Sequence, residues 1–107
     1  MRITYSNLMS TPVSLESDIQ DPRAYAKLGE QFLRDDEIVF EFGALARTLN
    51  SLLLVAFPPK LIDFLSLDVE GAELEVLKGV DHRAFRFKSI LFKCRDITRL
   101  SAYLENQ

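Results

Sequence analysis

Apolar and polar positions alternate along the chain in blocks that predict strands separated by single helices. Short runs rich in β-branched and aromatic residues are typical of strands, whereas apolar positions recurring every three or four residues indicate helices. The strands are expected at residues 2–6, 37–42, 62–67 and 89–94, and the helices at residues 21–34, 48–54, 72–78 and 96–106. Strands joined by single helices imply right-handed crossovers, so we expect an α/β fold with a mostly parallel sheet and flanking helices.

Residues that favour helix ends support these boundaries. Asp21 can accept hydrogen bonds from the first free amides of a helix, and Pro22 at the first helical position loses no hydrogen bond. Thr48 is placed to cap the second helix, which Pro58 ends. Gly79 is placed to close the third helix in a left-handed turn.

The predicted strand at 62–67 is followed at once by an acidic turn that contains Asp68, Glu70, Gly71 and Glu73. Ligands of open parallel sheets bind beyond the carboxyl ends of the strands. There Asp68 could bind a hydroxyl group, hold a divalent metal or accept a proton. Carboxylates are also stabilised at a helix N-terminus, so the pattern alone is more often a structural capping turn than a catalytic one.

Composition narrows the classes of partner. The 107 residues suffice for one small domain, and the formal charge of −3 comes without a basic stripe. We therefore expect neither nucleic acid nor a membrane as partner. The single cysteine, Cys94, excludes an intramolecular disulfide, and we predict no metal site. No apolar run is long enough to cross a bilayer and no signal peptide is visible, so a cytoplasmic setting is expected.

The segment PKLIDFLSLDVEGAELEVLKGVD (59–81) resembles the signature of the FkbM family of S-adenosylmethionine-dependent methyltransferases. Residues 5–19, 40–53 and 85–96 resemble further segments of that family, so the likeness covers nearly all of the chain. The resemblance implies a Rossmann-like class I methyltransferase fold. It also implies transfer of a methyl group from S-adenosylmethionine to the hydroxyl group of a small-molecule acceptor.

Position by position, the resemblance implies that Asp68 and Glu70 are catalytic and that Gly71 and Glu73 belong to the substrate-binding side of the turn. Asp68 would orient or deprotonate the acceptor, or bind a metal. Relatives carry an acidic residue where this chain has Lys93, which reverses the local charge.

The glycine-rich turn with which relatives bind the cofactor is not found among the four glycines of the chain. Residues 1–107 therefore resemble a single, partial FkbM-type domain, in which we expect weak or absent cofactor binding and a truncated or inactive enzyme. The alternative is a non-catalytic remnant acting as a scaffold or interaction module. In the family's strand order, the strand at 62–67 would lack a neighbour. We expect the strand at 37–42 or another chain to fill that place, with homo-oligomers through exposed sheet edges as one outcome.

Overall fold

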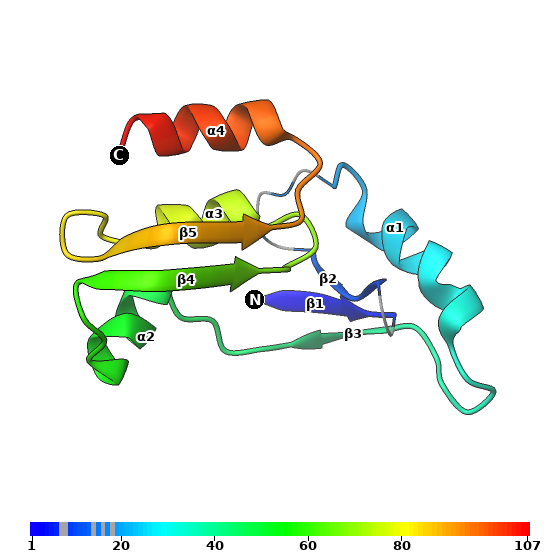
Figure 1. The fold of residues 1–107 in the computed structure, drawn as a ribbon. Coiled ribbons are helices and arrows are strands. Elements are labelled where there is room, and N and C mark those ends of the chain that lie inside the picture. Colours follow the sequence, from blue (N-terminus) through cyan, green and yellow to red (C-terminus); the bar gives the residue numbers. More distant parts are fainter. Residues whose placement is uncertain (7–8, 14, 16, 18) are drawn as a thin grey trace.

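The computed structural model describes residues 1–6, 9–13, 15, 17 and 19–107. It has two small sheets, each with its own helices, which lie side by side in Figure 1. The first sheet is antiparallel and is built from the N-terminal part of the chain. The second is a parallel pair of strands built from the C-terminal part.

The antiparallel sheet has the strand order β2-β1-β3, formed by β1 (Arg2–Tyr5), β2 (Thr11–Pro12) and β3 (Phe40–Gly43). Helix α1 (Pro22–Leu28) continues into the 3₁₀ helix η2 (Gly29–Phe32) and packs on β1 and β2. As predicted, the Asp21 carboxylate caps α1 by accepting a hydrogen bond from the amide of Ala24 (3.0 Å).

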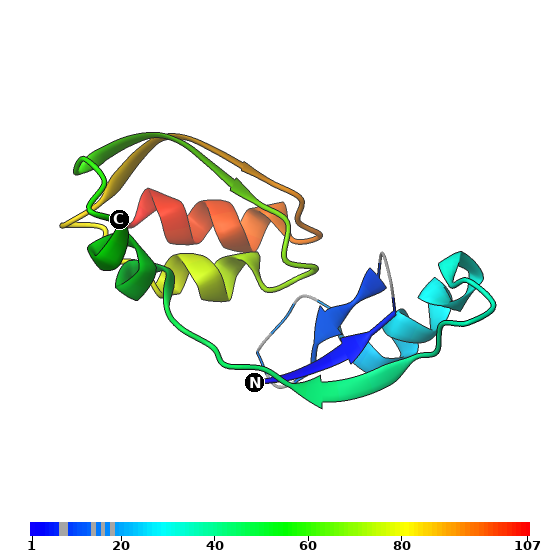
Figure 2. The same ribbon diagram turned by 90° about the horizontal axis from the view of Figure 1, so that it is seen from below.

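The C-terminal unit is built around β4 (Leu61–Leu67) and β5 (Arg86–Phe92), which pair in parallel. Helices α3 (Glu73–Lys78) and α4 (Ile97–Glu105) lie on the same side of this pair, as Figure 2 shows. Three buried leucines form the core between strands and helices, one each from β4, α3 and α4: Leu67, Leu77 and Leu100. None of the described helices covers the other face of the β4–β5 pair.

Helix α2 (Leu49–Ala56) lies beside this unit, and none of its residues is buried. Its start is fixed by two interactions, since Thr48 Oγ1 accepts the amide of Ser51 (3.2 Å) and the amide of Asn50 donates to the carbonyl of Gly79 (2.9 Å). The predicted Thr48 cap is thus confirmed. The prediction of a left-handed Gly79 at the end of α3 is wrong, because its φ is −79°. Helix α2, by contrast, does end in a left-handed residue, Phe57 (φ 49°).

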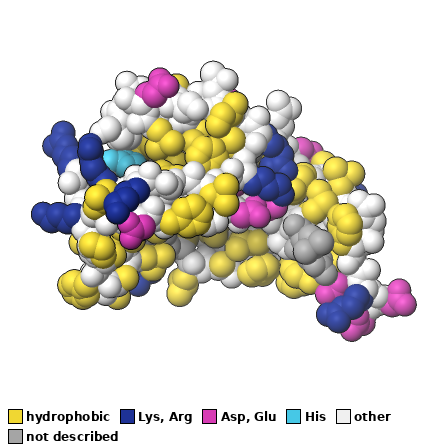
Figure 3. Space-filling view, in the orientation of Figure 1, with side chains coloured by type: hydrophobic (Ala, Val, Ile, Leu, Met, Phe, Trp, Pro, Cys, Tyr) yellow, Lys and Arg dark blue, Asp and Glu magenta, His cyan; other side chains and the backbone are white. Residues whose placement is uncertain are grey.

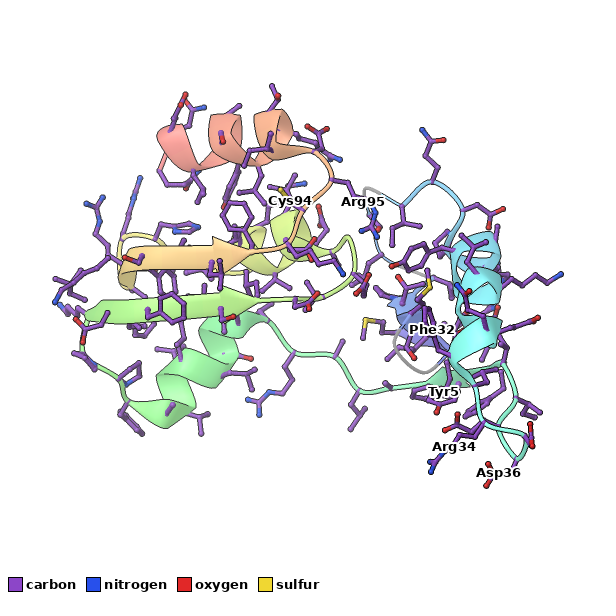
Figure 4. All side chains as sticks on the ribbon, turned by 45° about the vertical axis from the view of Figure 1, so that its right-hand side comes forward. Tyr5, Phe32, Arg34, Asp36, Cys94 and Arg95 are labelled. Carbon is purple, nitrogen blue, oxygen red and sulfur yellow. The ribbon has the colours of Figure 1, made fainter. Side chains whose placement is uncertain are left out.

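The expectation of a mostly parallel sheet is wrong, because β4 and β5 are the only parallel pair among the strands that the structure describes. The strand predicted at 37–42 forms β3, which runs antiparallel to β1 instead of beside β4. Charged and aromatic cross-strand pairs account for this choice. Glu41 of β3 forms ion pairs with Arg2 of β1 and Arg23 of α1, which lower the pKa of its carboxyl to about 2. The rings of Tyr5 and Phe40 lie 5.0 Å apart on the same two strands, near the labelled Tyr5 in Figure 4.

The end of α1 touches the end of β1 so closely that only glycine fits between them. Ser6 Oγ donates a hydrogen bond to the carbonyl of the fully buried Ala26. A Cβ atom on Gly29 would lie 2.8 Å from the Ser6 carbonyl oxygen and 2.9 Å from Met9 Cβ.

We expect Gly29→Ala to lower the free energy of unfolding by about 1–3 kcal/mol, because the added methyl group must push backbone atoms apart. Gly43→Ala is the matched control, since a Cβ atom there meets nothing within 4 Å. Thermal and urea unfolding followed by circular dichroism would measure both variants. Equal stability of the two variants would contradict the close contact.

Candidate functional site

The acidic turn joins the carboxyl end of β4 to the start of α3. Glu70 (φ 48°) and Gly71 (φ 95°) are both left-handed, and they reverse the chain within two residues. Gly71 adopts this conformation without steric cost, whereas a glutamate there costs on the order of 1 kcal/mol or more. Strain of this kind persists only where neighbouring interactions hold the residue in place.

Glu73 supplies one of these interactions from inside the turn. Its side chain is buried, with 1% of its surface exposed, and Oε1 accepts hydrogen bonds from the amides of Val69 (3.1 Å) and Gly71 (3.4 Å). Gly71 and Glu73 thus bond to each other within the turn. The substrate-binding role that the resemblance implies for them stays a prediction.

Glu70 is held from the outside by groups of α1 and of the segment after β5. Its Oε2 accepts a hydrogen bond from the hydroxyl of Tyr25 (2.6 Å), and its Oε1 lies 3.3 Å from Nζ of Lys93. A guanidinium nitrogen of Arg95 lies 3.6 Å from Oε2 and also donates to the Tyr25 hydroxyl (3.0 Å). Figure 4 labels Arg95 beyond the end of β5, where it faces α1. Only 14% of the Glu70 side chain is exposed.

These contacts favour the ionised carboxylate. Burial raises the pKa of the Glu70 carboxyl, but the hydrogen bonds from Tyr25 and Lys93 and the charges of Lys93 and Arg95 outweigh it and lower the pKa overall. The same hydrogen bond with Glu70 raises the pKa of Lys93. Lys93, which stands where relatives carry an acidic residue, therefore forms an ion pair with Glu70 of the same chain.

Asp68 differs from its two acidic neighbours because it is exposed. Among the residues that the structure describes, none forms a hydrogen bond with its carboxylate. Lys93 is near enough for the charge of Asp68 to contribute to the raised lysine pKa. In the described ranges, no group of three or more histidine, cysteine, aspartate or glutamate side chains could hold a metal ion.

Asp68 lines a cleft of about 880 Å³ whose other lining residues include members of the N-terminal sheet, α2 and α3. Figure 2 shows how these elements are arranged. Glu70 and Glu75 also border it, as does Arg47. Most of its wall is apolar: Ile3, Leu15, Leu45, Leu49, Leu52 and Val76. The volume falls within the range of small-molecule sites, which are about 300–1,000 Å³. The sequence-predicted pair is thus divided, with Asp68 open to the cleft and Glu70 engaged in ion pairs.

A model of the methyltransferase FkbM domain matches residues 7–100. The chain belongs to the FkbM methyltransferase family. No curated protein and no solved structure matches it. No helix within the described part of the FkbM chain is long and apolar enough to cross a membrane.

Membership of the FkbM family implies S-adenosylmethionine as the methyl donor. The glycines of this chain do not fit that cofactor, which needs free backbone amides in a flexible turn. Gly71 lies in a turn after a strand, but its amide is bonded to Glu73. The amide of Gly79 donates to carbonyls at the end of α3, Gly29 is packed against Ser6, and Gly43 lies within β3. The described residues therefore form no cradle for the cofactor.

Sequence reasoning missed Tyr25 and Arg95 as members of this site. Neither residue was among the candidates that the sequence pattern singled out. A usable signal was present, because the carboxyl ends of parallel strands meet at one edge, so Lys93 and Arg95 after β5 must lie near the acidic turn after β4.

We expect Glu70→Gln to lower the free energy of unfolding by about 1–2 kcal/mol, because it replaces charge-assisted bonds to Lys93, Arg95 and Tyr25 with neutral ones. Asp68→Asn is the matched control, and it should change stability by less than about 0.5 kcal/mol. Chemical unfolding at pH 7 would measure both. Equal stability of the two variants would contradict the anchoring role of Glu70.

Comparing wild type with Glu70→Gln at different pH values tests the lowered pKa of Glu70. A carboxyl whose pKa is lowered by folding stabilises the protein above its ordinary pKa and loses this contribution as the pH falls through the lowered value. The difference in Tm between wild type and Glu70→Gln should therefore be full at pH 6–7 and shrink below about pH 4.5. A difference that stays constant down to pH 3 would contradict the lowered pKa of Glu70.

Proposed function

We propose that this chain forms the acceptor side of an FkbM-type O-methyltransferase and binds an apolar molecule that carries a hydroxyl group. The observation that carries the proposal is the exposed carboxylate of Asp68 on the wall of a large, mostly apolar cleft. The methyl donor is then bound by a separate segment that contributes the glycine-rich turn.

The chemistry assigned to Asp68 follows from what methylation asks of a hydroxyl group. The acceptor oxygen must point one lone pair at the methyl group and must lose its proton. A carboxylate that accepts the O–H hydrogen bond fixes the direction of the oxygen and offers a destination for the proton. Asp68 suits this task better than Glu70, because the Glu70 oxygens are already bonded to Tyr25 and Lys93.

The apolar wall supports a lipid-like or polyketide-like acceptor over a free sugar. Each methylene group moved from water into an apolar site contributes about 0.8 kcal/mol, whereas a sugar would leave its hydroxyl groups facing Leu45, Leu49 and Leu52. One carboxylate among apolar groups suits a molecule with one hydroxyl at the reacting end.

We expect decane-1,10-diol to bind the chain more tightly than glucose, because only the diol can bury an apolar body and present a hydroxyl to Asp68. Asp68→Ala should weaken diol binding about tenfold to a hundredfold, which corresponds to one hydrogen bond to a charged group. Asp63→Ala is the matched control, an exposed aspartate on β4 whose only described ion pair is with Lys88. Ligand-observed NMR titration would measure the affinities, and equal losses in both variants would contradict the assignment.

We expect S-adenosylmethionine to show no binding to the 107-residue chain at micromolar concentrations, because no glycine-rich cradle is available. Isothermal titration calorimetry measures this directly. Micromolar binding would contradict the division of roles proposed here. Failure of both the diol and the cofactor to bind would instead favour a non-catalytic scaffold.

A further inference from the structure

A cation stands on the cleft wall together with Asp68. Among the described residues that line the cleft, Arg47 is the one with a basic side chain. It is exposed, and no described residue forms an ion pair or a hydrogen bond with its guanidinium group. Glu70 and Glu75 also border the cleft, but each forms an ion pair with a lysine. In the described part of the chain, the charges that the cleft leaves for a ligand are therefore those of Arg47 and Asp68.

These two charges lie near opposite ends of α3. Thr48, which follows Arg47, is placed at the C-terminal end of this helix, because the amide of Asn50 donates to the carbonyl of Gly79 (2.9 Å). Asp68 precedes the N-terminal end. The six residues of α3 span about 9 Å at about 1.5 Å each, and no ion pair joins Arg47 to Asp68. A ligand that meets both charges must therefore be elongated.

The wall between the two charges is apolar. Val76 lies on α3 between its ends, and Leu49 and Leu52 of α2 line the cleft as well. Leu45, close to Arg47 in the chain, is fully exposed, and Leu52 is 47% exposed. Figure 3 shows hydrophobic side chains over α2 and along the segment that joins it to β3. A hydrocarbon chain lying along this wall would take apolar surface out of water.

The surroundings of Arg47 favour an anion, and a carboxylate in particular. Arg47 immediately precedes Thr48, the N-cap of α2, so the partial positive charge of the helix start lies beside the guanidinium group. A guanidinium group presents two parallel N–H donors that match the two oxygens of a carboxylate. Asp68 would repel such an anion only weakly, because a separation of about 9 Å is close to the screening length of physiological salt.

We propose that the cleft binds a linear ω-hydroxy acid, with its hydroxyl group on Asp68, its carboxylate on Arg47 and its hydrocarbon chain along α3. The inference rests on the proposed function, since it keeps the same cleft and the same role of Asp68, and it adds the charge and the length of the acceptor. An extended chain advances roughly 3.5 Å over three backbone bonds, so about 9 Å corresponds to about eight bonds. The residues that line the cleft include none of β4, so the proposal makes no use of that strand's edge.

Ligand-observed NMR titration of the full chain with 10-hydroxydecanoate and decane-1,10-diol tests the anion site, because these ligands differ only at the end that meets Arg47. We expect the hydroxy acid to bind wild type about threefold to fivefold more tightly than the diol, which is what an ion pair with an exposed arginine contributes. Arg47→Gln should abolish this advantage and leave the affinity for the diol unchanged. Arg47→Lys should retain part of it, because it keeps the charge and loses the paired donors.

Arg83→Gln is the matched control, an exposed arginine in the turn before β5 that is not among the residues lining the cleft. It should preserve the advantage of the hydroxy acid. Salt at about 1 M, where the screening length falls to about 3 Å, should remove that advantage from wild type as well.

Two results would overturn the anion site and leave the role of Asp68 intact. One is equal affinity of wild type for the two ligands, and the other is an advantage of the hydroxy acid that survives Arg47→Gln. Failure of the proposed function has a different signature, because Asp68→Ala would then weaken the binding of neither ligand. Absence of binding by both ligands would overturn both proposals.

Discussion

The bonds made by Glu70 are the interactions on which the arrangement of the two sheets depends. Its side chain receives Tyr25 from α1 and Lys93 from beyond β5, while its own carbonyl accepts a hydrogen bond from Thr11 of β2 (3.1 Å). One residue thereby joins the N-terminal sheet to the C-terminal unit. The left-handed backbone of Glu70 is tolerated because these bonds fix both its side chain and its carbonyl. Glu70 also borders the cleft that lies between the two parts.

Three carboxylates within six residues thus have three different environments. Glu73 is buried and bonded to amides of its own turn, Glu70 is paired with cations, and Asp68 is exposed to the cleft. The sequence predicted the acidic turn and its place at the carboxyl end of a strand. It could not divide the roles, because the groups that engage Glu70 are distant: Tyr25 lies 45 positions away and Lys93 lies 23 positions away.

Local structure was predicted better than the pairing of strands. The caps at Asp21 and Thr48 depend on short-range hydrogen bonds, and both form as expected. The composition of residues 37–42 predicts a strand but does not predict which other strand it pairs with. Its partner is chosen by Arg2 and Arg23, which bind Glu41 from β1 and α1. The strand expected at 89–94 begins earlier, at Arg86, since Arg86 and Phe87 already pair with Leu61 and Ile62 of β4.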